Sequence, residues 1–354
     1  MLRTTVVAAM VLGAIALAVP AGARAPKTWV VRPNESVQAA VNAARPGDTI
    51  ILLPGTYRQS ITIKEDDITL RGAGGFGGGT VLRPPTNLRG QCKKVSGGSG
   101  VCVLGAFDAQ DQVTDRVSDV VVSGIQFLGW PSMGVFAYGT QDLLIDGNTA
   151  YNTGEYGLAS FDGLGAVIRN NRTGHTGEAG IYLGDSADAG AKISHNDSWD
   201  SAFGIFVRHS SGVTVQQNHV FDNCEGIMVL DDGQGGVADI TVKFNTATTN
   251  TKACPASDEA PALSGGGILL LGASDSSVTQ NIVRNNEGTE VNSGGILLLS
   301  AEELTGGSAP SNTVITDNLV FGNGPYDVFT DGSGTGNRLT GNFCETSAPA
   351  DFCV

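Results

Sequence analysis

Basic residues are scarce in this chain of 354 residues. Lysine and arginine together number 21, against 35 aspartates and glutamates, and the formal net charge is −14 at pH 7. Proteins that bind nucleic acids depend on clustered lysine and arginine, so this deficit predicts no nucleic-acid partner. An anionic polymer still fits if a local basic spot or a bound cation offsets the overall negative field.

Long apolar runs are absent after the first 25 residues. That opening segment, MLRTTVVAAMVLGAIALAVPAGARA, places Arg3 before a short apolar stretch and ends in Pro20 and small residues up to Ala25. The layout is typical of a secretory signal peptide (residues 1–25), and its apolar run is shorter than the ~20 residues that a membrane span needs. We therefore expect a secreted mature chain, residues 26–354, without a membrane span. Its 19 basic and 35 acidic residues give a formal charge of −16, because Arg3 and Arg24 leave with the signal peptide.

Only six cysteines are present, a number that fits an exported protein with disulfides. The sequence alone allows many pairings, and proximity along the chain favours three local ones. The expected pairs are Cys92–Cys102, Cys224–Cys254 and Cys344–Cys353.

Helical periodicity is nearly absent as well. The one amphipathic helix pattern is ESVQAAVNAAR, residues 35–45, which ends at the turn Pro46-Gly47-Asp48. The remaining chain consists of short β-rich segments separated by turns, so the sequence predicts an all-β protein.

A repeating unit begins at Val120. Each unit contains a β-rich triplet, an asparagine, a polar stretch, and then a glycine followed by alternating apolar residues. The asparagines recur mostly at intervals of 22 to 27 residues, and two wider gaps hold insertions. The asparagines are Asn148, Asn171, Asn196, Asn218, Asn245, Asn281, Asn318 and Asn342. The glycines are Gly134, Gly157, Gly180, Gly204, Gly226, Gly267 and Gly295.

This period predicts a β-solenoid of about 9–11 coils, in which equivalent residues of neighbouring coils stack about 4.8 Å apart. Stacked asparagines would bond to one another along the axis as an amide ladder. The chain lacks the LxxLxLxxN pattern of a leucine-rich repeat. Strict alternation of apolar residues beside each glycine also argues against a loose Gly/Asn-rich linker.

The chain resembles the right-handed parallel β-helix superfamily of pectate lyases, polygalacturonases, alginate and chondroitin lyases and mannuronan epimerases. The stretch SVQAAVNAARPGDTIILLPGTYRQSITI, residues 36–63, resembles the opening coil of the alginate/chondroitin lyase and epimerase branch. The resemblance implies one right-handed parallel β-helix domain over residues 26–354, with helix 35–45 capping its open end. It also implies a polysaccharide partner, and we expect a monomer.

Alternation assigns residues to the two faces of the strand that follows each glycine. Positions +1 and +3 after the glycine are apolar and fill the core, so positions +2 and +4 point outward. By resemblance, this outer face carries the substrate groove. Outward aromatic residues would stack on sugar rings or lie under loop cover, and both alternatives stay open. They are Phe136, Tyr138, Phe161, Tyr182 and Phe206.

For four outward leucines we favour cover by the inserts 246–264 and 300–311. They are Leu269, Leu271, Leu297 and Leu299.

The pair Arg208-His209 occurs in only one coil of this row. Uronate lyases and epimerases need a base and a cationic group that stabilises the enolate. Arg208 would neutralise the substrate carboxylate or act as the base, and His209 would be the second proton-transfer group, with Asp231 as a further catalytic candidate. Calcium could also bridge the substrate carboxylate. Its expected ligands are Asp185, Asp231, Asp232 and Glu225.

Several alternatives remain open. Mannuronan epimerases carry an Asp-Pro-His-Asp run on this strand, where this chain reads Phe206-Val207-Arg208-His209. Hydrolysis needs two carboxylates facing one bond, for which Asp231 and Glu225 are candidates, although Asp231 in DDGQGG is also typical of a turn. The pair Arg208-His209 could equally be a solvated surface feature. The chain would then be a non-catalytic carbohydrate-binding or cell-surface β-helix, or an accessory periplasmic one.

The four histidines invite a shared metal site, which we do not expect. They are His175, His195, His209 and His219. The repeat places them on different walls of the solenoid, whereas metal ligands must converge on one ion.

Overall fold

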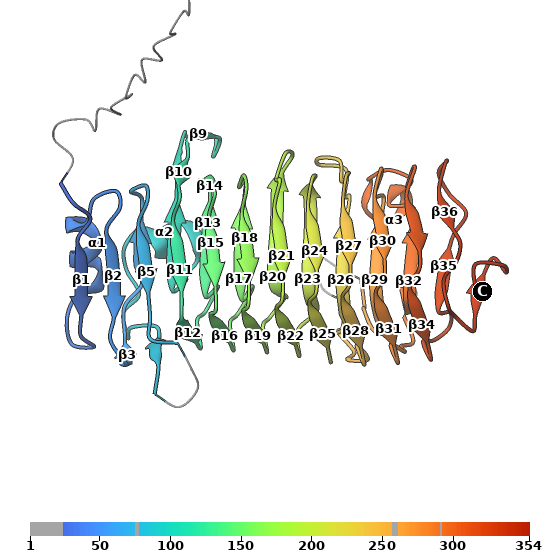
Figure 1. Ribbon diagram of the computed structural model, residues 1–354, viewed down its shortest axis with the longest axis horizontal. Helices are drawn as coiled ribbons and strands as arrows, with labels where there is room; N and C mark the ends of the chain where they lie inside the picture. The colour runs from blue at the N-terminus through green and yellow to red at the C-terminus, as the bar shows by residue number, and fades with distance from the viewer. Residues whose placement is uncertain (1–23, 75–77, 257–260, 291) are drawn as a thin grey trace, which may run out of the picture.

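The computed structural model describes residues 24–74, 78–256, 261–290 and 292–354. Most of the predicted signal peptide therefore lies outside the described residues. The described chain winds into a solenoid with three long parallel sheets, which we name sheets A, B and C. Figure 1 shows the coils stacked along one long axis, from the blue N-terminal end to the red C-terminal end. The expected fold class is confirmed.

Sheet A has twelve strands. In spatial order they are β1 (Thr28–Val31), β2 (Thr49–Leu52), β5 (Thr69–Arg71), β11 (Val121–Ser123), β15 (Leu144–Asp146), β18 (Val167–Arg169), β21 (Lys192–Ser194), β24 (Thr214–Gln216), β27 (Thr241–Lys243), β30 (Ser277–Thr279), β33 (Val314–Thr316) and β36 (Arg338–Leu339).

Sheet B has ten strands. They are β3 (Gly55–Tyr57), β6 (Thr80–Leu82), β12 (Ile125–Leu128), β16 (Thr149–Tyr151), β19 (Arg172–Gly174), β22 (Asp197–Trp199), β25 (His219–Phe221), β28 (Thr246–Thr248), β31 (Ile282–Arg284) and β34 (Leu319–Phe321).

Sheet C has eleven strands and follows the repeated glycines. They are β4 (Ile61–Ile63), β7 (Val101–Leu104), β13 (Val135–Tyr138), β17 (Leu158–Phe161), β20 (Ala179–Ser186), β23 (Phe203–Ser210), β26 (Glu225–Leu230), β29 (Gly266–Leu271), β32 (Gly294–Leu299), β35 (Val328–Thr330) and β37 (Ser347–Ala348). Two short pairs lie outside the three sheets, an antiparallel one and a parallel one. They are β8 (Ala106–Phe107) with β9 (Val113–Asp115), and β10 (Val117–Ser118) with β14 (Thr140–Gln141).

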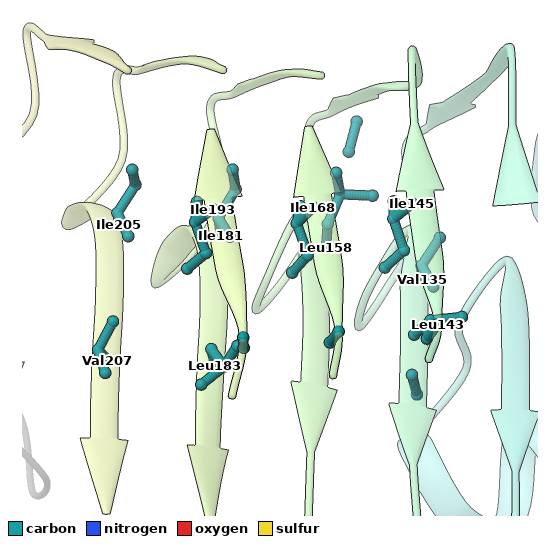
Figure 2. Packing of buried hydrophobic residues seen from close by; sticks show 14 of the residues in the cluster. Val135, Leu143, Ile145, Leu158, Ile168, Ile181, Leu183, Ile193, Ile205 and Val207 are labelled. Carbon is teal, nitrogen blue, oxygen red and sulfur yellow. The ribbon is translucent and has the colours of Figure 1, made fainter. Parts of the chain in front are cut away.

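The core lies inside the solenoid and is built from repeated apolar residues. Leu158, Ile181 and Ile205 occupy the same register position in neighbouring coils of sheet C and are fully buried. Figure 2 shows these side chains in one inward row. The next inward row, which contains Leu183 and Val207, is buried in the same way. The predicted alternation is therefore confirmed along sheet C.

The predicted asparagine ladder is present. Each Nδ2 donates to Oδ1 of the next asparagine along the axis, as from Asn196 to Asn218 at 2.9 Å and from Asn218 to Asn245 at 3.0 Å. Each amide also donates to a backbone carbonyl and accepts from a backbone N–H, so all its polar atoms are satisfied although it is buried. The ladder runs from Asn148 to Asn342.

A second ladder was missed by the sequence analysis. It begins where Asn223 accepts from the Ser201 backbone N–H, and it continues through Asn250 and Asn286 to Asn323. Because its asparagines follow strands of sheet B by only two residues, they fall inside the polar stretch that precedes each glycine.

The predicted capping helix is confirmed as α1 (Val37–Ala43). Ser36 begins it, because its hydroxyl accepts the backbone N–H of Ala39 at 3.2 Å. The Gln38 side chain pairs with the backbone of Thr62 and so covers the free edge of β4, the first strand of sheet C.

All three predicted disulfides are present. Cys92–Cys102 attaches α2 (Gln91–Ser96) to β7, and Cys224–Cys254 attaches the first large insert to β26. Cys344–Cys353 closes the C-terminal segment, and α3 (Glu302–Thr305) lies in the second insert. In the described part of the chain, no helix is long and apolar enough to cross a membrane.

Candidate functional site

The outer face of sheet C carries Arg208 and His209 near the end of β23. Alternation alone would turn His209 inward, because it follows the outward Arg208 directly. His209 instead has φ +45°, and its neighbour Asp185, one coil earlier, has φ +58°. Histidine and aspartate are among the residues that tolerate this left-handed conformation. The backbone turn therefore brings Arg208, His209 and Asp185 to the same outer edge.

Four side chains form one connected network, which we name the Arg–His cluster: Asp185, His209, Asp232 and Arg208. His209 Nδ1 lies 2.8 Å from Asp185 Oδ1, and its Nε2 contacts Asp232 Oδ1. Arg208 Nε donates to Asp232 Oδ2 at 2.8 Å, and its Nη2 donates to the same oxygen. Each ring nitrogen of His209 therefore faces a carboxylate oxygen, one from the preceding coil and one from the following coil.

The members of the Arg–His cluster differ in their access to solvent. The side chains of His209 and Asp232 are 7% and 11% exposed, whereas those of Arg208 and Asp185 are 32% and 47% exposed. A ligand would therefore meet Arg208 and Asp185 first, with His209 and Asp232 behind them.

Tyr182 lies beside Arg208 beneath the cluster. Burial raises the pKa of the Tyr182 phenol, nearby Asp185 adds to this, and the Arg208 guanidinium opposes it. Burial lowers the pKa of Arg208, but the hydrogen bonds and charge of Asp232 outweigh it and leave the pKa raised. The tyrosine is consequently a neutral hydroxyl at pH 7, and the arginine a permanent cation.

Gly184 makes room for the Tyr182 hydroxyl. A Cβ at Gly184 would lie 2.1 Å from the Tyr182 hydroxyl oxygen, so no larger residue fits without moving the ring. This glycine pairs with Phe161 and Arg208, at a position where neighbouring coils carry side chains. A lone glycine in that row was the one sequence signal that could have indicated the Tyr182–Arg208 contact.

Three of the predicted sugar-stacking residues are buried, which leaves cover, rather than an open stacking platform, as the alternative that fits them. Phe136, Tyr182 and Phe206 are only 8%, 1% and 4% exposed. Cover comes from a ring of the preceding coil for Tyr182 and from a ring of the same strand for Phe206. Tyr156 stacks on Tyr182 at 4.5 Å between centroids, and Phe203 stacks on Phe206 at 4.7 Å. These rings belong to a second apolar cluster on the outer face of sheet C.

Tyr138 and Phe161 remain partly exposed. The β8–β9 hairpin lies against Tyr138: Phe107 meets the Tyr138 ring edge-on at 5.6 Å, and the Tyr138 hydroxyl donates to the Asp111 carbonyl. Of the five predicted aromatic residues, these two are the ones with accessible ring surface.

The four outward leucines are buried, as expected for residues under inserts. Leu269, Leu271, Leu297 and Leu299 are at most 7% exposed and share the outer apolar cluster with Leu263 and Ala301, which come from the two inserts.

Asp231 and Glu225 do not join the Arg–His cluster, and this corrects the roles predicted for them. Asp231 is buried, and its carboxylate accepts the backbone N–H groups of Gly233 at 2.9 Å and Ser308 at 3.0 Å. It therefore stabilises a turn, as the DDGQGG pattern also allowed. Glu225 is fully buried, and neither of its carboxyl oxygens has a hydrogen-bond partner among the residues that the structure describes. Burial raises its pKa well above the usual value, opposed only by the nearby Ser264 backbone.

The four carboxylates proposed as calcium ligands are not brought together. Asp185 and Asp232 contact opposite nitrogens of His209, while Asp231 and Glu225 are engaged or enclosed elsewhere. Within the described ranges, no group of three or more His, Cys, Asp or Glu side chains is arranged to hold a metal ion. A calcium ion at these residues stays a prediction.

The remaining histidines lie away from the cluster. His175 pairs with Asp200 at 2.7 Å, and His219 lies 3.8 Å from Asp197 on the outer surface of sheet B. His195 follows β21 of sheet A.

Comparison with known proteins now identifies the family. The family model described as "Right handed beta helix region" matches residues 68–202 and 133–344. The chain belongs to this family. The predicted superfamily is thereby confirmed, and the handedness of the solenoid follows from it. No curated protein sequence matches the chain.

Solved structures similar to this β-helix protein include the Azotobacter vinelandii mannuronan C-5 epimerase AlgE4 A-module, with a TM-score of 0.61 and 18% identity, covering 90% of this chain and 94% of that one. A second is DFA-IIIase from Arthrobacter chlorophenolicus A6 without its lid, with a TM-score of 0.58 and 14% identity, covering 92% of this chain and 97% of that one. A third is the alginate lyase from Paenibacillus sp. str. FPU-7, with a TM-score of 0.51 and 18% identity, covering 92% of this chain and 96% of that one. At these identities the likeness shows the fold.

Proposed function

We propose that the β-helix protein is a secreted enzyme that acts on an acidic polysaccharide by removing the proton next to a uronate carboxylate. The observation that carries this proposal is the Arg–His cluster. It combines an accessible cation, an accessible carboxylate and a histidine that links them through a second carboxylate. The epimerase and alginate lyase among the similar folds support the substrate class.

Arg208 is the group that would neutralise the substrate carboxylate. Loss of the adjacent proton pushes charge onto that carboxylate, and a positioned guanidinium stabilises the charge as it develops. A substrate would compete with Asp232 for Arg208, whose Nη1 makes no hydrogen bond to Asp232.

Asp185 is the most accessible base, and this assignment refines the sequence-based one. Because both its nitrogens already contact carboxylates, His209 has no free nitrogen to accept the substrate proton and is not the first base. Asp185 would accept the proton, and His209 would stabilise or relay it toward Asp232. Expulsion of the neighbouring glycosidic oxygen, which takes up a proton from water, then gives β-elimination, whereas delivery of a proton from water to the opposite face of C5 gives epimerisation.

A non-catalytic role in carbohydrate binding is the second candidate. It is favoured by the contacts within the cluster, since Asp232 contacts both Arg208 and His209 and so engages the cation and the histidine. In that case Arg208 and Asp185 would bind saccharide without turnover.

The test is an assay of the mature chain on polyuronates and neutral glycans. Ultraviolet absorbance of unsaturated uronate detects β-elimination, exchange of the C5 proton with deuterated solvent detects epimerisation, and reducing ends without absorbance indicate hydrolysis. We expect Arg208→Ala and Asp185→Asn to reduce the signal about 100-fold or more, while Arg169→Ala, which removes an exposed arginine from sheet A, leaves it intact.

Binding without turnover in any of these assays would establish the binding protein instead. The same assay tests calcium: loss of turnover in a chelator, restored by added calcium, would support the predicted ion.

A further inference from the structure

Charge is divided unevenly along the solenoid. Residues 26–94 contain ten lysines and arginines against five acidic residues, a formal charge of +5. Residues 95–354 contain nine against thirty, a formal charge of −21, and the two parts together give −16. Because the chain winds steadily along one axis, the positive part is the N-terminal end of the molecule (Figure 1). An anionic ligand is repelled by most of the surface and attracted to this end.

A cleft of about 590 Å³ opens at this end, between α1 and the segment that leads into α2. Gln38 and Asn42 of α1 line one side, Arg89 and Gln91 line the other, and Thr62 and Lys64 form the floor. The volume is within the usual range for small-ligand sites, roughly 300–1,000 Å³. Polar side chains that can reach sugar hydroxyls therefore surround the cleft together with two cations.

Both walls of the cleft are held in place by the protein. Gln38 donates to the Thr62 carbonyl at 2.9 Å and accepts the Thr62 N–H at 2.8 Å, which fixes α1 on β4. On the other wall, the Cys92–Cys102 disulfide joins the start of α2 to β7. A cleft with fixed walls loses little conformational freedom when a ligand binds.

The two cations are available to a ligand. Lys64 and Arg89 are exposed, and neither has an ion pair or side-chain hydrogen bond among the described residues. Arg208, by contrast, is paired with Asp232. Glu65 also stands exposed at the cleft, and the two cations outnumber it.

The cleft lies on the same face of sheet C as the Arg–His cluster. Ile61 and Ile63 are buried, so Thr62 and Lys64 face outward. Pairing of Thr62 with Cys102 places Lys64 at the start of the outward row that leads to Arg208. Five strand spacings separate β4 from β23, or about 24 Å.

We propose that this cleft is a second saccharide site, which binds the carboxylate of a uronate residue through Lys64 and Arg89, with the amide groups of Asn42 and Gln91 contacting its hydroxyls. The choice of ligand rests on the proposed function, but the site itself does not depend on catalysis at Arg208. The distance of about 24 Å makes it a remote subsite that would hold part of a long polymer.

The test is calorimetric titration with a mannuronate trisaccharide, using Arg208→Ala as the background so that the Arg–His cluster contributes little. We expect Lys64→Gln/Arg89→Gln to weaken affinity about tenfold or more, since two charge-assisted contacts are lost. The matched control is Lys192→Gln/Lys243→Gln, which removes the same charge from sheet A and should change affinity less than about twofold. Neutral mannotriose should bind at least about tenfold more weakly than the uronate.

Equal affinity in the two double variants, or no binding by the background protein, would overturn the proposal. Competition by sulfate at the same concentration as the trisaccharide would reassign the cleft to simple anions. Saccharide binding at the cleft in a protein that never turns over any polyuronate would keep this inference and reject the enzyme. Three of the four substituted side chains are exposed and Lys243 is partly exposed on the outer face of sheet A, so thermal unfolding should be nearly unchanged and will verify folding.

Discussion

The two faces of sheet C differ in how regularly their residues repeat from coil to coil. On the inner face, Ile181, Ile205 and Ile227 repeat the same residue from coil to coil and are fully buried. On the outer face of the same strands, Gly184, Arg208 and Leu230 follow one another with no common chemistry. The inner face is constrained by packing that every coil shares, whereas the outer face differs in each coil and carries the candidate site. Departures from the repeat, rather than the repeat itself, indicate function in this molecule.

The largest expected effect comes from breaking the inner face. Ile205→Ala removes a fully buried side chain from the middle of a row, and such a cavity costs about 2–5 kcal/mol of unfolding free energy. Urea unfolding measures the change, with Thr214→Ala on the outer face of sheet A as the control. Turnover per folded molecule should stay near that of the parent protein. A large loss of turnover at full folding would show that the two faces are not independent.

The outer face should respond in the opposite way. Arg208→Ala is expected to reduce turnover about 100- to 1,000-fold, the usual effect of removing a group that stabilises developing charge. Its unfolding free energy should change by less than about 1 kcal/mol, because the pair with Asp232 is partly exposed. Turnover and urea unfolding measured on the same sample separate the two effects. Unfolding as severe as that of Ile205→Ala would instead assign Arg208 a structural role.

The asparagine ladder offers a third test of the repeat. Asn218→Ala leaves the Asn196 amide and backbone N–H without their acceptor, and the Ile193 carbonyl and Asn245 Oδ1 each lose a donor. We expect a loss of about 1–3 kcal/mol of unfolding free energy, since buried polar groups become unsatisfied. Thermal or urea unfolding against Asn34→Ala, an exposed asparagine outside the ladder, measures it. Equal stability in the two variants would contradict a structural role for the ladder.

The smallest expected effect concerns Glu225 and is a change in how steeply the unfolding free energy falls with rising pH. Burial raises the pKa of this carboxyl in the folded protein, so the folded state binds its proton more tightly than the unfolded chain does. The stabilisation is complete below the unfolded pKa and is lost as pH rises through the folded value, by at most about 1.4 kcal/mol per pH unit. The glutamine in Glu225→Gln cannot ionise, so this substitution should remove the contribution of Glu225 to the pH dependence of the unfolding free energy. Unfolding free energies of the two proteins that fall in parallel between pH 5 and pH 8 would refute the assignment.

Many features of the fold could be predicted because they depend on short-range patterns. Alternation beside each glycine predicts the inward rows, and one asparagine per coil predicts the first ladder. Proximity of the cysteines predicts all three disulfides. The second ladder was missed because Asn223 and Asn250 fall in variable polar stretches, where no single position stands out.

The candidate site was predictable only in part. The pair Arg208-His209 is conspicuous as a break in the repeat, but its partners are not. Asp231 and Asp232 are adjacent and chemically alike, yet one stabilises a turn and the other binds both Arg208 and His209. Glu225, selected for its charge, is enclosed under an insert tied down by the Cys224–Cys254 disulfide.

The sequence by itself determined the solenoid, its register, its cap and its disulfides, because each of these follows from residues that are close in the chain or recur at a fixed interval. Only the tertiary structure decided which side chains meet on the outer face. His209 is turned outward by a left-handed backbone, Tyr182 is covered by a ring from the preceding turn, and Asp232 arrives from the next coil. Those contacts join residues more than twenty positions apart, and their geometry depends on how the coils stack in space.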